Sequence, residues 1–225
     1  MNIEKLYRKD LDNLWHNTSC SKYSSIGRGY AIERNVAKES ILFISLNPSY
    51  SSAKAWNNGN SNSSVFYDIP PIEEKNNTNS FFAAINEFYD SLSVPKPPLA
   101  HHDLLFVRET KQESVKAMIK DPILSQFVLR QLEISKSIIY DSRPQLVVVL
   151  NAEARELIKE KCEKDFIGFD PTIGANVYKL NGQETPFLFS GMLSGQHALD
   201  KGSRESLKWH IELIIKSRHT SIGKP

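Results

Sequence analysis

The chain has 225 residues, of which 40% are hydrophobic and 24% charged, ordinary values for a globular protein with a buried core. The formal net charge of +2 does not by itself require a polyanionic partner, although it leaves room for a local basic surface. The two cysteines, Cys20 and Cys162, are too few for a four-cysteine iron–sulfur or zinc site. We therefore expect neither a metal nor a cofactor.

Targeting and domain signals are weak along the whole sequence. The first residues lack the apolar segment of a secretory signal, and no stretch approaches the roughly 20 apolar residues of a membrane helix. We therefore expect a cytoplasmic protein without membrane association or an obligate protein partner. No linker divides the chain, so we expect one domain over residues 1–225, with an N-terminal helix and connection at 1–38 and a flexible tail at 217–225.

The first half of the chain begins with a helix and a buried strand. Residues 3–15 have apolar side chains at helical spacing, and a polar connection follows over residues 20–38. Residues 41–46 are almost continuously apolar, which is typical of a strand covered on both faces. Asn47-Pro48 ends this strand, because proline cannot donate to a β-ladder, and a long Ser- and Asn-rich loop follows at 49–79.

The rest of the chain alternates helices with short apolar runs. Helical spacing or capping residues predict helices over 81–92, over 121–140 with Asp121 as the cap, over 152–162 after Asn151, and from Ser203 onwards. Apolar runs predict strands at 103–107 and 145–150, with weaker candidates at 176–180 and 186–190. This alternation predicts an α/β fold with a parallel sheet.

In such a sheet, ligands bind beyond the carboxyl ends of the strands. The candidate loops are therefore 47–51, 108–112, 150–153 and 190–201. No glycine-rich phosphate-binding motif follows any strand, so nucleotide binding by those devices is not supported. His101 and His102 are adjacent on a predicted strand entry and point to opposite faces, so we do not expect them to bind one metal together.

Four segments, taken together in their order along the chain, are more informative about function than any single motif. The first is the turn Leu46-Asn47-Pro48-Ser49, and the second is Asn79-Ser80-Phe81-Phe82 at the start of a helix. The third is a helix over 127–133 that leads through Pro144 into the apolar strand. The last is a strand at 187–190 followed by Gln196-His197.

This order resembles the uracil-DNA glycosylase superfamily over about residues 40–215. The turn at Asn47 is similar to the Gly-x-Asn-Pro-Gly motif of the mismatch-specific and single-strand-selective branches. His197 falls where the superfamily carries its late His-Pro-Ser motif, although Ala198 replaces the proline. The resemblance implies a three-layer αβα fold around a central, mostly parallel four-stranded sheet.

The implied function is a DNA glycosylase that acts on uracil or a related damaged or mismatched base in single- or double-stranded DNA. It would flip the base out and hydrolyse its N-glycosidic bond with water. Asn47 would hold the water, and His197 would donate a hydrogen bond to the departing base. The other site residues that the resemblance implies are, for the base, Tyr50, Phe82, Arg108 and Asn151, and for DNA, Ser49, Gln196, Leu199, Lys201 and Arg204.

Two other interpretations stay open. Arg108 and Glu109 lie where many members carry a uracil-reading asparagine, and this favours another specificity or a catalytically inactive module that binds a nucleobase, nucleotide or nucleic acid. Alternatively, the chain is an unrelated doubly wound protein that binds a small molecule. Individual residues also have plain structural readings: Asn47-Pro48 is a common turn, and Phe82 fits the apolar face of a helix.

Overall fold

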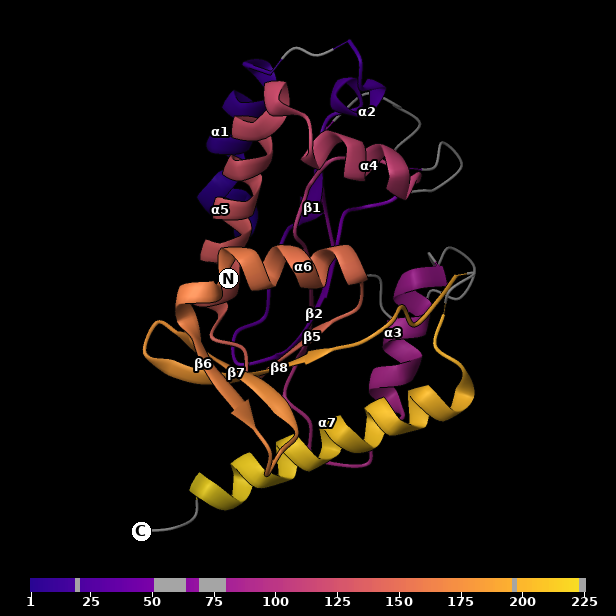
Figure 1. Cartoon of the computed structure of the whole chain (residues 1–225), viewed down its shortest axis with the longest axis vertical. Coiled ribbons are helices and arrows are strands. Elements are labelled where there is room, and N and C mark those ends of the chain that lie inside the picture. The colour runs from indigo at the N-terminus through magenta and orange to yellow at the C-terminus, as the bar shows by residue number, and fades with distance from the viewer. Residues whose placement is uncertain (19–20, 51–63, 69–79, 196–197, 223–225) are drawn as a thin grey trace. The chain divides into compact units, whose positions relative to one another are not determined.

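The computed structural model describes residues 1–18, 21–50, 64–68, 80–195 and 198–222 (Figure 1). The chain forms two compact units. Unit 1 comprises Met1–Val36, Leu46–Ile69 and His102–Ile138, and unit 2 comprises Ala37–Ser45, Pro70–His101 and Ile139–Pro225. The single-domain organisation stays a prediction.

Unit 2 is built around a mixed sheet with the strand order β4-β2-β5-β8-β7-β6. β2 pairs in parallel with β5, and β5 pairs in parallel with β8, whereas β7 runs antiparallel to both β8 and β6. The α/β class predicted from the sequence is therefore confirmed. The strands are β2 Ile41–Ser45, β4 Leu99–Asp103, β5 Leu146–Val149, β6 Phe166–Asp170, β7 Ala175–Leu180 and β8 Gln183–Phe189.

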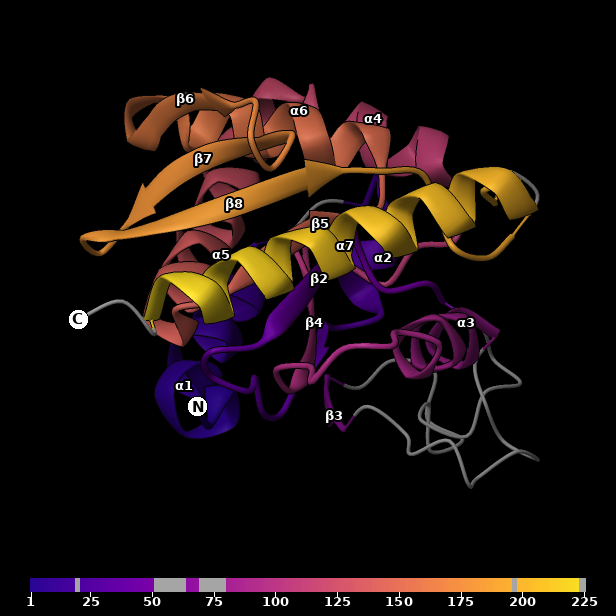
Figure 2. The same ribbon diagram turned by 90° about the horizontal axis from the view of Figure 1, so that it is seen from below.

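Helices cover both faces of this sheet, which explains why its central strands are apolar throughout. Every residue of β2 and β5 is buried. The helices α3 Ser80–Asp90 and α7 Lys201–Ile222 share one core with alternate strand residues such as Phe43, Val148 and Leu188. The helix α6 Ala152–Lys161 lies on the opposite side of the sheet from α7 (Figures 1 and 2).

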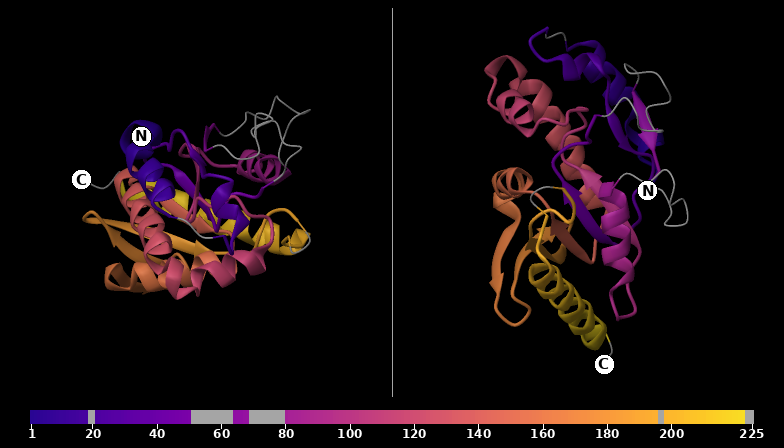
Figure 3. Two further views of the ribbon diagram at one scale, coloured as in Figure 1. Left: turned by 90° about the horizontal axis from the view of Figure 1, so that it is seen from above. Right: turned by 90° about the vertical axis from the view of Figure 1, so that its right-hand side faces the viewer.

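The sheet has six strands where the sequence suggested four. β6 stands at one edge of the sheet and forms a hairpin with β7 (Figure 2; Figure 3, right panel). β6 escaped prediction although Phe166, Ile167 and Phe169 are apolar, because the run is short and Gly168 interrupts it. The predicted strands at 176–180 and 186–190 are present as β7 and β8.

The predicted strand at 103–107 is wrong, because the strand in this region, β4, ends at Asp103. The backbone groups that follow find other partners within unit 1. Leu105 N–H donates to Leu46, Phe106 N–H to the Gln131 side chain, and Phe106 C=O accepts from Ala31. The segment is apolar because it is buried. Its backbone N–H and C=O groups nevertheless bond to a side chain and to other backbone segments, and not to a β-ladder.

Unit 1 contains helices and a small parallel sheet. Its helices are α1 Ile3–His16, α2 Ser24–Gly27, α4 Gln112–Ile119 and most of α5 Ser125–Ser142, and its strands β1 Ala31–Glu33 and β3 Val65–Tyr67 pair in parallel. The residues of α2 and β1 lie in the predicted polar connection at 20–38, and those of β3 in the predicted loop at 49–79. Edge-to-face aromatic contacts hold the unit: Trp15 packs on Tyr30 and Phe127, with ring centroids 5.2 and 4.8 Å apart.

Helix ends follow the sequence in some places and depart from it in others. The Asp121 carboxylate accepts from the N–H of Ile123, as its predicted cap role requires, but a short 3₁₀ turn at Pro122–Leu124 precedes α5. Ser203 does not begin α7. The Asp200 side chain instead accepts from the Ser203 N–H at 3.0 Å, because the helix already starts at Lys201. The helix α7 continues to Ile222, and the predicted flexibility of the tail at 217–225 stays a prediction.

Gln131 on α5 gives a direct test of how unit 1 holds its irregular segment. Its Oε1 accepts from the Phe106 N–H at 2.8 Å, and the side chain is fully buried. We expect Gln131→Ala to lower the free energy of unfolding by about 1–3 kcal/mol, because a buried N–H loses its acceptor. The exposed Gln126 on the same helix is the matched control. Urea unfolding of both alanine variants checks this, and equal stabilities would contradict it.

Candidate functional site

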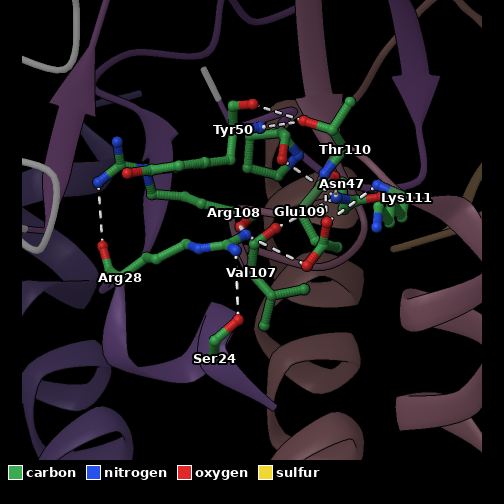
Figure 4. Close-up of polar contacts among 10 residues, drawn as sticks. Ser24, Arg28, Asn47, Tyr50, Val107, Arg108, Glu109, Thr110 and Lys111 are labelled. Carbon is green, nitrogen blue, oxygen red and sulfur yellow. Dashed lines mark hydrogen bonds and ion pairs between the residues drawn. The ribbon is translucent and has the colours of Figure 1, made fainter. Parts of the chain in front are cut away.

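Asn47 follows the end of β2 by two residues, and its amide group is tightly held within unit 1 (Figure 4). Its Nδ2 donates to three backbone carbonyls: Glu109 at 2.7 Å, Pro48 at 3.0 Å and Val107 at 3.2 Å. These bonds fix the orientation of the amide plane. Oδ1 accepts no hydrogen bond from the part of the chain that the structure describes, so it is the atom of Asn47 that is left to bind a ligand or water.

The loop that faces Asn47 is organised around Glu109. Oε1 of this carboxylate accepts from the N–H groups of Thr110 and Lys111, both at 2.9 Å. Its Oε2 lies 3.1 Å from Nη1 of Arg28, and both side chains are largely shielded from solvent. Glu109 also donates its own N–H to the Pro48 carbonyl at 3.1 Å, which ties the two loops together. The carboxylate therefore fixes the loop and the position of an arginine at once.

Tyr50 lies beside two guanidinium groups. The Cζ atoms of Arg28 and Arg108 are 4.3 and 5.2 Å from the centre of its ring. Hydrogen bonds with Thr110 hold the Tyr50 backbone, and Arg108 donates to the Arg28 carbonyl at 2.9 Å (Figure 4). Burial lowers the pKa of the Arg108 guanidinium below its ordinary value, but an arginine remains charged.

The cluster of Arg28, Asn47, Tyr50, Arg108 and Glu109 combines a fixed amide with an aromatic ring and two guanidinium groups, of which Arg28 is paired with Glu109 and Arg108 is fully buried. Such a set suits a planar polar ligand better than an apolar one.

The candidate residues fall into three groups. Unit 1 contains Asn47, Ser49, Tyr50 and Arg108, and unit 2 contains Phe82, Asn151, Leu199, Lys201 and Arg204. Gln196 and His197 lie outside the described residues. The structure brings Asn47, Tyr50 and Arg108 together, and the predicted approach of His197 to Asn47 stays a prediction.

Phe82 and Leu199 have structural environments in unit 2. Phe82 is only 7% exposed and packs edge-on against Phe81 and His101, with ring centroids 5.4 and 5.2 Å apart. Leu199 is partly buried against the sheet core. The core packing of both side chains favours a structural role over contact with a base or a DNA duplex.

The two basic candidates belong to the exposed start of α7. Lys201 is its first residue and is exposed, and the Arg204 N–H donates to the Asp200 carbonyl at 3.0 Å. No hydrogen bond or ion pair is recorded for either side chain within the described parts of the chain, so both are available to a phosphate.

Asn151 caps helix α6, and the contribution of this cap to stability can be measured. Its Oδ1 accepts from the N–H groups of Glu153 at 2.8 Å and Ala154 at 3.2 Å. We expect Asn151→Ala to lower the free energy of unfolding by about 1 kcal/mol, whereas Asn151→Ser keeps the cap and nearly the full stability. Thermal unfolding measures this. A serine variant as unstable as the alanine variant would show that capping is not what Asn151 supplies.

The sequence alone predicts no site role for Arg28 or Thr110 and no structural role for Glu109. Arg28 was placed in a polar connection, and its partners Arg108 and Glu109 lie 80 and 81 positions further along the chain. No local sequence signal links residues so far apart.

Comparison with known proteins adds no family to this geometry. No protein-family model matches the chain, and a search of the curated proteins finds no match to it. None of the described helices is long and apolar enough to cross a membrane.

Proposed function

We propose that this chain is a DNA glycosylase that hydrolyses the N-glycosidic bond of uracil or of a related damaged or mismatched base. The observation that carries the proposal is the anchored amide of Asn47. Its three donated hydrogen bonds fix the direction in which Oδ1 points. A fixed acceptor of this kind orients a water molecule towards a sugar carbon without acting as a strong base. The proposal also includes the three-layer αβα arrangement with a glycosylase-like parallel sheet.

The proposed chemistry divides between two side chains. Asn47 Oδ1 accepts a hydrogen bond from the attacking water, so that a lone pair of the water points at C1′ as the base departs. As the water's oxygen bonds to C1′ and the N-glycosidic bond breaks, the water gives up a proton to solvent and the departing base anion takes one up. His197 donates a hydrogen bond to the carbonyl oxygen of the base, where negative charge develops. The absence of a strong base in this pair predicts a slow enzyme.

The order of the strands supports the fold part of the proposal. β2, β5 and β8 are neighbours and parallel, and Asn47 follows β2 while Asn151 follows β5. In open α/β sheets, ligand-binding loops lie beyond the carboxyl ends of such strands. The position of Asn47 directly after β2 therefore agrees with a ligand-binding role for its loop.

A second candidate function has its own support. Arg28 and Arg108 lie over the ring of Tyr50, and Arg28 is held by Glu109 and by the Arg108 carbonyl. Arg108 is fully buried, so the part of this group that a ligand can reach is the Tyr50 ring with Arg28 beside it. An aromatic ring with an arginine beside it favours binding of a nucleotide or nucleic acid, whether or not hydrolysis follows. A glycosylase-like module without activity would need only this part of the site.

One panel of substrates separates the two functions. The protein is incubated with single- and double-stranded oligonucleotides that contain uracil, hypoxanthine or a mismatch, and abasic sites are revealed by alkaline cleavage. Cleavage by the wild-type protein and by the exposed-site control Asn13→Ala, but not by His197→Ala, supports the enzyme. Binding that weakens with salt, without abasic sites on any substrate, supports the module and contradicts the enzyme.

A further inference from the structure

A cavity of about 580 Å³ lies in unit 1 beside helix α4 (Figure 1). Part of its lining is one face of α4, where Glu113, Ala117 and the C-cap Lys120 follow one another at helical spacing. Lys22 and Tyr23, from the segment just before α2, also line it. The volume falls in the range of about 300–1,000 Å³ that is typical of small-molecule sites.

One ion pair in the cavity wall is already satisfied within the protein. Nζ of Lys22 donates to Oδ2 of Asp121 at 2.7 Å, and the Tyr23 hydroxyl donates to the same oxygen at 3.1 Å. The other oxygen of Asp121 accepts from the Ile123 N–H at 3.0 Å. Both oxygens of this carboxylate have partners, so the pair of Lys22 and Asp121 adds little net charge to the cavity.

Glu113 and Lys120 are the two charged lining residues that remain, and both are exposed. Within the parts of the chain that the structure describes, neither side chain has a recorded hydrogen bond or ion pair. Glu113 belongs to the first turn of α4, and Lys120 follows its last residue. Their separation of seven positions corresponds to about 10 Å along an α-helix. The lining is therefore dipolar, with a negative end and a positive end.

Uncharged side chains line the helix between these two ends. They are Ser114, whose hydroxyl can donate to or accept from an amide, and Ala117. The ligand that fits best therefore has a neutral, amide-like middle and opposite charges at its ends. An extended peptide of about three residues spans about 10 Å and carries such charges on its free α-ammonium and α-carboxylate groups.

We propose that this cavity binds short peptides with free ends, of about three residues, with the α-ammonium at Glu113 and the α-carboxylate at Lys120. The cavity is open to solvent, and exposed ion pairs each contribute little to binding. We therefore expect a dissociation constant on the order of 1 mM. This proposal is independent of the proposed glycosylase activity.

Titration of the isotope-labelled full chain with trialanine, followed through its amide NMR signals, tests the site. At about pH 6.5 both ends of the peptide are charged. We expect saturable shifts centred on residues 113–122. N-acetyl-trialanine and trialanine amide each lack one terminal charge, and each is expected to bind about two- to fivefold more weakly than trialanine.

Neutral substitutions test which residue contacts which end. We expect Glu113→Gln to bind trialanine about two- to fivefold more weakly than the wild type, and to bind N-acetyl-trialanine as the wild type does, because both changes remove the same ion pair. Lys120→Gln is expected to behave in the same way towards trialanine amide. Glu133→Gln and Lys9→Gln change exposed charges of unit 1 outside the lining, and these matched controls are expected to bind as the wild type does.

Three results would overturn the proposal, with thermal unfolding used to show that each variant is folded. The first is a wild-type protein without saturable shifts at residues 113–122. The second is binding that is equally strong when either end of the peptide is blocked. The third is a Glu113→Gln protein that still distinguishes trialanine from its acetylated form as the wild type does.

Discussion

Alanine in place of Asn47 is expected to slow base release from a uracil-containing oligonucleotide by about 10²–10³-fold, the usual cost of removing one positioned polar group from an active site. The reason is geometric. Nδ2 is held by the carbonyls of Pro48, Val107 and Glu109. The amide is therefore already oriented when water binds to Oδ1. Single-turnover kinetics with excess enzyme isolate the hydrolytic step from product release.

The control for this variant must separate catalysis from folding, because alanine also removes the two hydrogen bonds that join this turn to Val107 and Glu109. The rates of Asn47→Ala and of Asn13→Ala are therefore compared at a temperature where unfolding curves show both to be folded. DNA binding is measured in parallel. A purely structural role would weaken binding and stability together, whereas the proposed role lowers the rate and leaves binding nearly unchanged. A folded Asn47→Ala protein with the wild-type rate would contradict the role.

The loss of Glu33 is expected to have the largest effect on stability. Its carboxylate is fully buried in unit 1, where Oε2 lies 3.1 Å from Nδ1 of the buried His102 and Oε1 accepts from the Asp103 N–H at 3.1 Å. We expect Glu33→Ala to lower the free energy of unfolding by about 3–5 kcal/mol, because buried donors lose their acceptor. Chemical denaturation measures this, with Glu113→Ala as a control for an exposed carboxylate.

A buried tyrosine also belongs to the hydrogen-bonded group around Glu33. The Tyr67 hydroxyl donates to the Asp103 carboxylate at 3.2 Å. Burial, reinforced by the charges of Glu33 and Asp103, raises the pKa of Tyr67 well above its usual range, so the hydroxyl remains a donor at neutral pH. A Glu33→Ala protein as stable as Glu113→Ala would contradict this expectation, because it would show that the buried donors find other partners without loss of unfolding free energy.

The parts of the fold that the sequence predicted have strong local signals. The apolar runs at 41–46 and 145–150 became β2 and β5, and Asn151 caps the helix where its side-chain chemistry indicated. The missed elements depend on distant partners. β1 is only three residues long and exists because it pairs with β3, more than 30 residues later. A run this short gives no periodic pattern to detect.

The candidate site shows the same division. The turn at Asn47-Pro48 could be predicted, because proline after asparagine ends a strand. The environment of the amide could not, because its acceptors at Val107 and Glu109 lie 60 and 62 positions away. The strand predicted over 103–107 failed for a related reason: Gln131 on α5 satisfies the Phe106 N–H in place of a neighbouring strand.

Hydrolysis in water enriched in heavy oxygen tests whether Asn47 positions a water molecule that releases the base. A single-stranded uracil oligonucleotide is incubated with the wild-type protein, and the products are analysed by mass spectrometry. We expect free uracil without the label and an abasic sugar that carries it at C1′, with both products lost in Asn47→Ala. No uracil release by the wild-type protein, or equal release by Asn47→Ala, would contradict the proposed role of Asn47.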